Sequence, residues 1–463
     1  MSRVVLLGLF LLTPSPLLAE GGIPPDASLS LWWAFPFVGM LLSLALLPLV
    51  ASHFWEAHYG KVAVAWALMA AVGLSAAFGF SPAKTEILGT LFHHYLPFVI
   101  MIGSLYTIAG GIQIRVESPG TPLTNTAFLA VGTFLAGWIG TTGAAMLLIR
   151  PFLHMNARRK NRVPHMIFFI FLIANVGGAL TPLGDPPLFL GFLNGVSFFW
   201  TVEFLSFEML MIALPLLLIF YILDQALVKK EGLSLQNRWP KTTVKGGFNG
   251  FLFLGVMGFV LMSGMWAPEI SVHIAGISLD LQDVVRDGGL ILLAMGSYVF
   301  TPSDIHTSNH FSWEPLKEVI KLFFGIFVTV IPVIAILEAG TQGALAPLVS
   351  LVTHNETPQN AMYFWLSGGL SSFLDNAPTY LVFFHMAGGD APTLMSLLSG
   401  TLVAISCGSV FMGAMTYIGN APNFMVKTIA EGHKIQMPSF FGYMGWSVVI
   451  LLPLLFLLSW WRF

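Results

Sequence analysis

Long apolar stretches alternate with short polar segments along the chain, and most have the length of a membrane-spanning helix, roughly 20 residues. Two of them are too long for one plain span and contain Gly and Pro breaks, which predict interrupted helices (165–200 and 394–426). Eight more are predicted as single spans: 31–51, 61–80, 94–112, 207–228, 247–266, 288–301, 316–340 and 439–460. Two further stretches, 126–153 and 359–388, have polar, helix-breaking centres and are predicted to form re-entrant hairpins.

Residues 1–22 have the pattern of a secretory signal, with a basic start at Arg3, an apolar stretch and small residues near Ala19. Cleavage near Ala19 and an uncleaved first helix both fit this pattern. Either arrangement places residues 20–30 outside the cytoplasm.

The composition supports a membrane protein and excludes several other classes. Hydrophobic residues make up 56% and charged residues 9%, whereas a soluble domain is roughly 25% charged. The 20 Lys and Arg against 22 Asp and Glu leave no basic excess for binding nucleic acid. The single cysteine excludes a disulfide scaffold or a thiolate metal cluster. The expected class is therefore an all-α polytopic membrane protein.

The basic residues orient the predicted spans, because cytoplasmic loops are rich in Lys and Arg. If both hairpins return to their side of entry, Lys84, Arg286 and Arg462 lie outside and the other 17 of the 20 basic residues lie inside. A full crossing by either hairpin would invert every later loop. The pattern favours hairpins entering from opposite sides. We expect the protein to lie in a bacterial inner membrane with a periplasmic C-terminus.

An internal repeat divides the chain into two halves. Residues 178–189 and 413–424 are identical at six of twelve aligned positions, at an offset of 235. This offset pairs Asp185 with Asn420, whereas the hairpin centres align at an offset of 234, which pairs Asp375 with Thr141. We expect repeats at 23–228 and 247–463, joined by a cytoplasmic linker at 229–246.

Each repeat then has five spans and one hairpin, and five is odd, so the second copy is expected to be inverted. Inverted repeats with broken helices are typical of secondary transporters, with the site at the midplane. A channel is the nearest alternative, although channels more often repeat around their pore.

The breaks contain the candidate chemistry. Each places an N-cap residue before a resumed helix, so partial positive charges at helix ends should converge there. Asp185 and Asp375 are acids at predicted membrane depth, where a carboxylate is costly and usually functional. Pure helix capping is the alternative, although Ser or Asn would cap without the charge.

Hard oxygen ligands without a fixed cation favour competition between Na⁺ and H⁺. The predicted cation shell comprises Asp185, Asp375, Asn376, Asn420 and Thr181. The predicted substrate pocket adds residues from the same breaks: Thr141, Thr142, Gly184, Pro186, Thr379, Thr416, Gly419 and Asn423. No cofactor is expected, since Na⁺ would be the transported or coupling ion. No Ser/His/Asp constellation lies at one depth, so we do not expect an enzyme.

At these breaks the chain resembles the ion transporter superfamily, which includes NhaD-type sodium/proton antiporters, citrate and dicarboxylate symporters, and arsenite transporters. Residues 174–185 and 373–378 are similar to the NhaD-type pattern of a Pro-(Ile/Leu)-Gly-Asp break and an Asp-Asn-(small)-Pro hairpin tip. The resemblance implies a homodimer in which a transport domain carrying both hairpins moves against a rigid scaffold, like an elevator.

The chain departs from the family patterns at two places. Sodium-coupled dicarboxylate carriers have Ser-Asn-Thr at the hairpin tips, where this chain has Thr141-Thr142 and Asp375-Asn376. Pro186-Pro187 replaces the Thr-rich stretch that follows the Asp in the NhaD-type pattern.

The leading hypothesis is a sodium/proton antiporter that exchanges Na⁺ or Li⁺ for H⁺. The alternative is a Na⁺- or H⁺-coupled symporter for citrate or a dicarboxylate, because helix N-termini facing the pocket would attract an anion.

Overall fold

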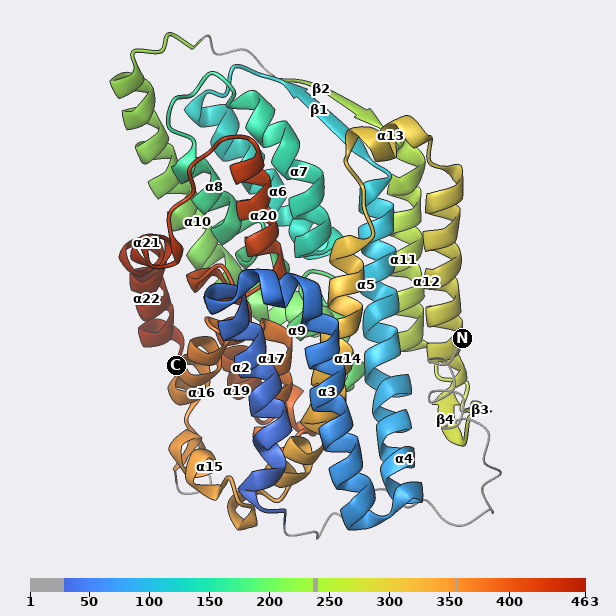
Figure 1. Cartoon of the computed structure of the whole chain (residues 1–463). Coiled ribbons are helices and arrows are strands. Elements are labelled where there is room, and N and C mark those ends of the chain that lie inside the picture. Colours follow the sequence, from blue (N-terminus) through green and yellow to red (C-terminus); the bar gives the residue numbers. More distant parts are fainter. Residues whose placement is uncertain (1–28, 236–239, 355–356) are drawn as a thin grey trace.

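The computed structural model describes residues 29–235, 240–354 and 357–463 (Figure 1). The predicted signal segment 1–22 lies outside these residues. The described chain is mostly helical, in agreement with an all-α membrane protein. Three small antiparallel sheets supplement the helices, and the sequence patterns did not indicate them: β1 (Gln113–Glu117) with β2 (Lys241–Lys245), β3 (Ser271–Ile274) with β4 (Ile277–Asp280), and β5 (Thr353–His354) with β6 (Thr357–Pro358).

Among the described residues, 8 helical stretches are long and apolar enough to cross a membrane. Some of these stretches consist of α-helices that are joined directly by a short 3-10 or π-helical segment. The helices in them are η1 (Leu31–Ala34) with α2 (Phe35–Val50), α3 (Ser52–Phe78), α4 (Phe80–Thr90) with η2 (Leu91–Tyr95) and α5 (Leu96–Gly110), α6 (Pro122–Ile139), α10 (Phe198–Glu231), α11 (Gly247–Met265), α14 (Glu314–Glu338), and α21 (Phe440–Trp446) with η6 (Ser447–Leu451) and α22 (Leu452–Arg462).

Helix α12 (Leu281–Phe300) begins seven residues before the span expected at 288–301. Its first turns contain Arg286, which pairs with Asp283 at 2.7 Å and Asp287 at 2.8 Å. These ion pairs allow the helix to start within a charged segment that the hydropathy pattern assigned to a loop.

The two apolar stretches with polar centres are helical hairpins, and both overlong stretches are interrupted. In the first half, α7 (Thr141–Met155) follows α6, and α8 (Val163–Leu172) continues through η3 (Val176–Ala179) to α9 (Pro186–Leu193). In the second half, α16 (Asn360–Ser371) precedes α17 (Asn376–Met386), and α19 (Ser399–Phe411) continues through η5 (Met412–Met415) to α20 (Ala421–Gly432). The remaining short helices are α13 (Ser303–Ser308), η4 (Gly340–Gln342), α15 (Ala346–Val352) and α18 (Ala391–Met395).

The two hairpins occupy different ends of the molecule. In Figure 1, α6, α7 and α8 lie in the upper half, whereas α16, α17 and α19 lie in the lower half. In each interrupted stretch, the helix after the break lies towards the opposite half of the molecule: α9 is below α8, and α20 is above α19. All four breaks therefore meet near the middle of the molecule.

The helices pack as two groups. One contains α2 to α5, α11, α12 and α14, with α3 against α14 and α12 against α5 and α11. The other contains α6 to α10 and α16 to α22, with α16 against α19 and α17 against α9. Contacts between the groups include α5 with α7 and α14 with α17. In each hairpin, one arm thus contacts the first group.

Candidate functional site

Two threonines hold the broken helices in the same way. The Thr181 hydroxyl donates to the Gly137 carbonyl and accepts from the Leu183 amide at 3.2 Å. The Thr416 hydroxyl donates to the carbonyl of Ser372 and accepts from the amide of Ile418 at 3.2 Å. The three residues around Thr416 each follow their counterparts around Thr181 by 235 positions. Each threonine thereby attaches its break to the neighbouring hairpin.

Glycine is required where each broken chain crosses itself. A Cβ atom on Gly184 would lie 2.3 Å from the Gly178 carbonyl oxygen, and one on Gly419 would lie 2.5 Å from that of Gly413. Real Cβ atoms do not approach backbone oxygens so closely. Gly184 and Gly419 thus permit the tight crossing that precedes the cap residues Asp185 and Asn420.

The residues that directly precede the helices after the four breaks repeat at a single offset of 235. This corrects the offset of 234 that the sequence predicted for the hairpin tips. Asp185 and Asn420 occupy the N-cap positions of α9 and α20, and both have extended backbones and no side-chain hydrogen bond to the helix they precede. Gly140 precedes α7 and Asp375 precedes α17, again 235 positions apart. Asp375 therefore corresponds to Gly140 and not to Thr141. Thr141 corresponds to Asn376, since each is the first residue of its helix.

The carboxylate of Asp185 lies at the centre of the site and receives side chains from the other three breaks. Its Oδ1 accepts from the Thr141 hydroxyl at 2.8 Å and from Asn420 Nδ2 at 3.2 Å. Its Oδ2 accepts from Asn376 Nδ2. All four residues are at most 2% exposed. The site thus consists of two equivalent pairs, Thr141 with Asn376 and Asp185 with Asn420.

Charge compensation separates the buried acids of the described chain into two kinds. Glu208 accepts from Arg462 at 2.7 Å, and Asp224 pairs with Arg159. Neither Asp185 nor Asp375 forms an ion pair with a basic side chain in the described ranges. A buried charge is normally paired or coordinates a metal ion. Asp185 and Asp375 are thus the buried acids whose charge no basic side chain of the described residues compensates.

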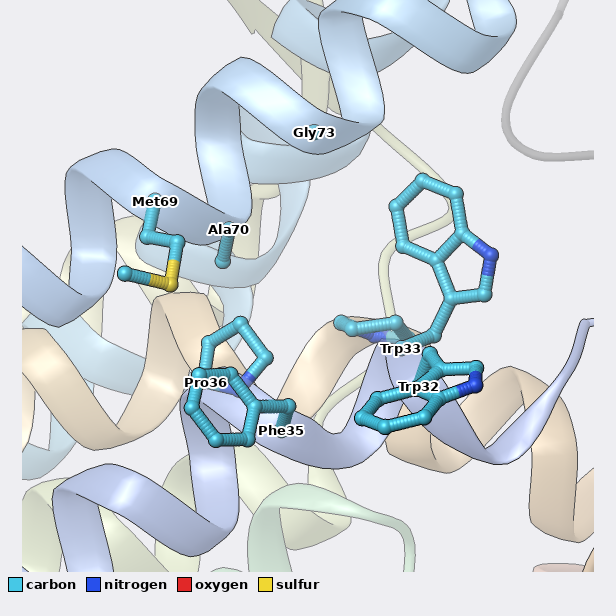
Figure 2. A pocket seen from close by; sticks show the side chains of 8 residues that line it. Trp32, Trp33, Phe35, Pro36, Met69, Ala70 and Gly73 are labelled. Atoms are coloured by element: carbon cyan, nitrogen blue, oxygen red, sulfur yellow. The ribbon is translucent and has the colours of Figure 1, made fainter.

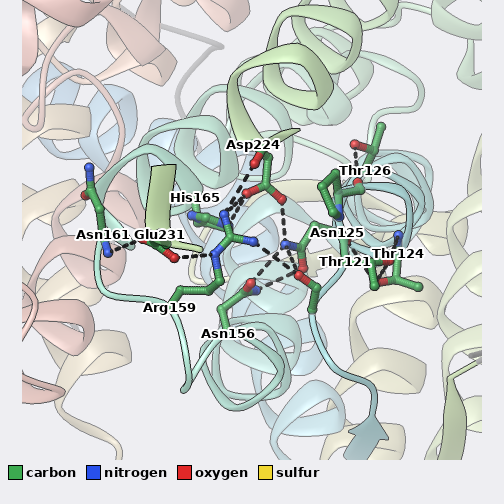
Figure 3. A network of polar contacts seen from close by, with 12 residues as sticks. Thr121, Thr124, Asn125, Thr126, Asn156, Arg159, Asn161, His165, Asp224 and Glu231 are labelled. Atoms are coloured by element: carbon green, nitrogen blue, oxygen red, sulfur yellow. Dashed lines mark hydrogen bonds and ion pairs between the residues drawn. The ribbon is translucent and has the colours of Figure 1, made fainter. Parts of the chain in front are cut away.

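Figure 3 shows how fully the structural acid Asp224 is compensated. Besides Arg159, it accepts from Asn125 Nδ2 at 2.9 Å, and His165 Nε2 lies 3.2 Å from its Oδ1. Arg159 also reaches Glu231 at 3.1 Å. This network fixes α10 to the base of the first hairpin and leaves no role for a mobile ion at Asp224.

Asp375 is adjacent to the cluster in sequence but has a different contact. Its Oδ1 accepts from the Ala377 amide at 3.1 Å, which caps α17, and the Thr379 hydroxyl donates to its carbonyl at 3.0 Å. Asn376, the next residue, turns into the cluster instead. The Asn376 Oδ1 atom is buried without a hydrogen-bond partner among the described residues, so it can serve as a further oxygen ligand.

Three other predicted residues line a small cavity beside the cluster. Thr142, Gly184 and Pro186 border a cavity of about 20 Å³ between the first hairpin tip and α5. This volume is sufficient for about one water molecule. Thr181 and Thr416 are instead engaged with the hairpin backbones, as described above, and do not reach the carboxylate of Asp185.

Asn175 is a polar neighbour of this cluster that the sequence analysis did not single out. It is fully buried, and its Nδ2 donates to Asn423 Oδ1 at 2.7 Å. Asn423 in turn donates to the carbonyls of Gly413 at 2.8 Å and Thr416 at 2.9 Å. An amide inside the apolar stretch 165–200 was the signal that could have identified Asn175.

A larger cavity elsewhere does not have the chemistry of a polar site. A cavity of about 230 Å³ near the start of α2 is lined by Trp32, Trp33 and Phe35 and by Met69 of α3, and Figure 2 shows these side chains. Its lining contains no charged side chain. The described residues also contain no group of three or more His, Cys, Asp or Glu able to hold a metal ion. The Asp185 cluster therefore remains the candidate site.

Comparison with known proteins agrees with a transporter. The model of a family described as “Putative citrate transport” matches residues 26–463. No curated protein matches the chain.

Proposed function

The chain belongs to this transporter family of the ion transporter superfamily, and from that premise we propose that it is a secondary transporter that exchanges Na⁺ or Li⁺ for H⁺ at Asp185. The observation that carries the proposal is the buried Asp185 carboxylate, which receives three neutral side chains and forms no ion pair within the described chain. A cation and a proton would neutralise it alternately.

The surrounding groups suit this competition. The Thr141 hydroxyl and the free Oδ1 of Asn376 offer neutral oxygens beside the carboxylate. Small hard cations prefer such oxygen ligands. A proton on Asp185 would remove the charge that attracts the cation, so only one of the two binds at a time. We assign Asp375 to the same exchange as a second, peripheral acid.

The proposed mechanism has an inverted repeat and a moving transport domain. The matched contacts at an offset of 235 and the opposite placement of the hairpins in Figure 1 support the inverted repeat. The two packed helix groups support a scaffold and a transport domain. We place the protein in a bacterial inner membrane as a homodimer, with a periplasmic C-terminus.

Coupled transport of citrate or a dicarboxylate is the second candidate, and the family description, “Putative citrate transport”, does not decide between it and cation exchange. The N-termini of α7, α9, α17 and α20 supply partial positive charge near the cluster. In this alternative the two acids bind coupling cations. The arrangement leaves the cargo carboxylates without a basic partner at Asp185, which is why we place exchange first.

Inverted membrane vesicles with an internal pH probe separate the two functions. Na⁺, Li⁺, K⁺ and citrate are added in parallel to vesicles with wild-type protein or Asp185→Asn. We expect Na⁺ and Li⁺ to dissipate the pH gradient in the wild type without citrate, and to have no effect in the variant. Exchange retained by Asp185→Asn contradicts the proposed site. Labelled citrate uptake without cation-driven exchange supports the symporter instead.

Asp375→Asn separates charge from capping, since Asn caps a helix about as well as Asp. We expect this variant to insert normally and to lose exchange because the second negative charge is missing. Immunodetection in the membrane fraction measures insertion, and the same vesicle assay measures exchange. Wild-type exchange in Asp375→Asn reduces Asp375 to a helix cap.

A further inference from the structure

Three buried asparagines form an amide bridge between the two broken helices, and we use this name for Asn175, Asn420 and Asn423. Asn175 precedes η3 in the first half, whereas Asn420 and Asn423 belong to the start of α20 in the second half. Asn175 Nδ2 donates to Asn423 Oδ1 at 2.7 Å and to the Ile170 carbonyl at 2.9 Å. Asn420 Nδ2 lies 3.3 Å from Asn175 Oδ1.

The amide nitrogen of Asn420 has more acceptors than it can satisfy. Its Nδ2 lies 3.1 Å from the Ala174 carbonyl, 3.2 Å from Asp185 Oδ1 and 3.3 Å from Asn175 Oδ1. An amide group has two hydrogens, so three acceptors share two donors. Removing Asp185 Oδ1 from this set would leave one acceptor for each hydrogen.

The amide bridge has no counterpart at the positions that the internal repeat relates to it. The residues 235 positions away are apolar: Val410 corresponds to Asn175, and Leu188 corresponds to Asn423. The backbone of η5 passes close to the bridge at Gly413, where a Cβ atom would lie 3.0 Å from Asn175 Oδ1. An apolar pair at these positions is therefore compatible with a broken helix, which leaves the amides a role beyond holding the break.

We propose that Asn175 is a positioning residue for ion exchange, because its Oδ1 accepts a hydrogen bond from Asn420 Nδ2 when a cation or a proton occupies Asp185. This inference rests on the proposed function. With Asp185 charged and empty, Asn420 donates to the carboxylate. When Asp185 Oδ1 binds a cation or becomes protonated, the Ala174 carbonyl and Asn175 Oδ1 together satisfy both hydrogens. Asn175 thus stabilises the loaded state without contacting the ion.

Replacing Asn175 by Ala should weaken loading more than turnover. The loaded state loses an acceptor, whereas the empty state still has Asp185 and Ala174 for the two hydrogens of Asn420. We expect the Na⁺ concentration for half-maximal exchange to rise about three- to tenfold, the effect of one buried hydrogen bond. Proton binding weakens for the same reason, so the pH profile should shift to lower pH. The maximal rate per inserted protein should change little.

The experiment compares variants in proteoliposomes containing a pH probe, with Na⁺ titrated at several pH values. Asn175→Ala is the test variant, and Asn175→Ser is a smaller change in case the alanine variant does not fold. Asn249→Ala is a matched control, because Asn249 is 1% exposed and its Nδ2 donates to the Gly111 carbonyl at 2.8 Å and to Thr301 at 2.9 Å in the other helix group. The Na⁺-dependent rise of the unfolding temperature in detergent is measured for each.

The outcomes distinguish this inference from the proposed function. The expected result for Asn175→Ala or Asn175→Ser is a higher Na⁺ concentration for half-maximal exchange and a pH profile shifted to lower pH. For Asn249→Ala the half-maximal Na⁺ concentration should be unchanged. Unchanged half-saturation and pH profile in both Asn175 variants overturn the inference while exchange stands. The same shifts in Asn249→Ala also overturn it, since they would show a general effect of lost stability. A wild type without any Na⁺ or Li⁺ response overturns the proposed function, and the inference with it.

Discussion

Arg159 illustrates at the scale of single residues how this protein contains a buried ionic network without using it for transport. It is 4% exposed and contacts Asp224 and Glu231, both on α10. The Glu231 carboxylate also accepts from the Asn161 amide at 2.9 Å. Since Asp224 is fully buried, its charge depends on Arg159 for compensation.

Replacing Arg159 by Leu should therefore destabilise the protein strongly. Removal of one partner from a buried ion pair typically costs about 3–5 kcal/mol, because the other charge remains uncompensated. We expect a clear fall in the unfolding temperature of purified Arg159→Leu in detergent. Its exposed neighbour Arg158 provides the control, and Arg158→Leu should unfold like the wild type. Equal unfolding temperatures for all three proteins would show that Asp224 does not need its partner.

The sequence singled out Asp185 as a charge within a long apolar stretch, but it did not reveal which buried acids have basic partners. Glu208 and Asp224 are also buried acids, and only the fold shows that Arg462 and Arg159 compensate them. These partners are 254 and 65 positions away in the chain. Asn175 escaped notice because a neutral amide has little effect on a hydropathy pattern.

At the scale of elements, Gly and Pro predicted where the helices break, and the breaks occur there. The observed helix ends at Ile139, Ser371 and Ala179 lie inside the stretches 126–153, 359–388 and 165–200, each of which was predicted to be interrupted. The alignment of the two hairpin tips was wrong by one residue, because their sequences share too few identities to fix it. The shared hydrogen bonds of Thr181 and Thr416 fix it at 235.

These two threonines give a paired prediction for the broken helices. Thr181→Val and Thr416→Val keep the shape of the side chain but leave a buried carbonyl and a buried amide without a partner. Each lost group costs about 1–3 kcal/mol, so both variants should lower the unfolding temperature by similar amounts. The control Thr428→Val changes a threonine that bonds the Phe424 carbonyl on the exposed side of α20 and should have little effect. A marked difference between Thr181→Val and Thr416→Val would contradict the equivalence of the two breaks.

At the scale of the whole molecule, the two halves are connected more closely than a flexible linker would allow. β2 lies within the predicted linker 229–246 and pairs along its length with β1 of the first half, from Gln113 with Lys245 to Glu117 with Lys241. Short strands with alternating charged residues have no distinctive signal beside strongly apolar helices, so the sequence did not indicate this ribbon. β1 contacts α7, and the ribbon thus lies next to the first hairpin.

The contact between α14 and α17 offers a test of movement between the two helix groups. Glu338 ends α14, and its Oε1 lies 3.5 Å from His385 Nδ1 near the end of α17. If the second hairpin moves against the scaffold during transport, this contact must break in each cycle. We expect a short thiol-specific cross-linker to stop exchange in Glu338→Cys/His385→Cys, prepared with Cys407→Ala to remove the native buried thiol. Cleaving the cross-link should restore exchange.

A second cysteine pair controls for the reagent itself. Lys427 Nζ lies 2.9 Å from Glu431 Oε1, and both residues belong to α20. Cross-linking Lys427→Cys/Glu431→Cys therefore cannot restrain one helix group against the other. This pair and the two single variants at 338 and 385 should keep their exchange after treatment. Full exchange by the completely cross-linked 338/385 pair would mean that α14 and α17 stay together throughout the cycle. The moving unit would then have to be smaller than the helix group that contains both hairpins.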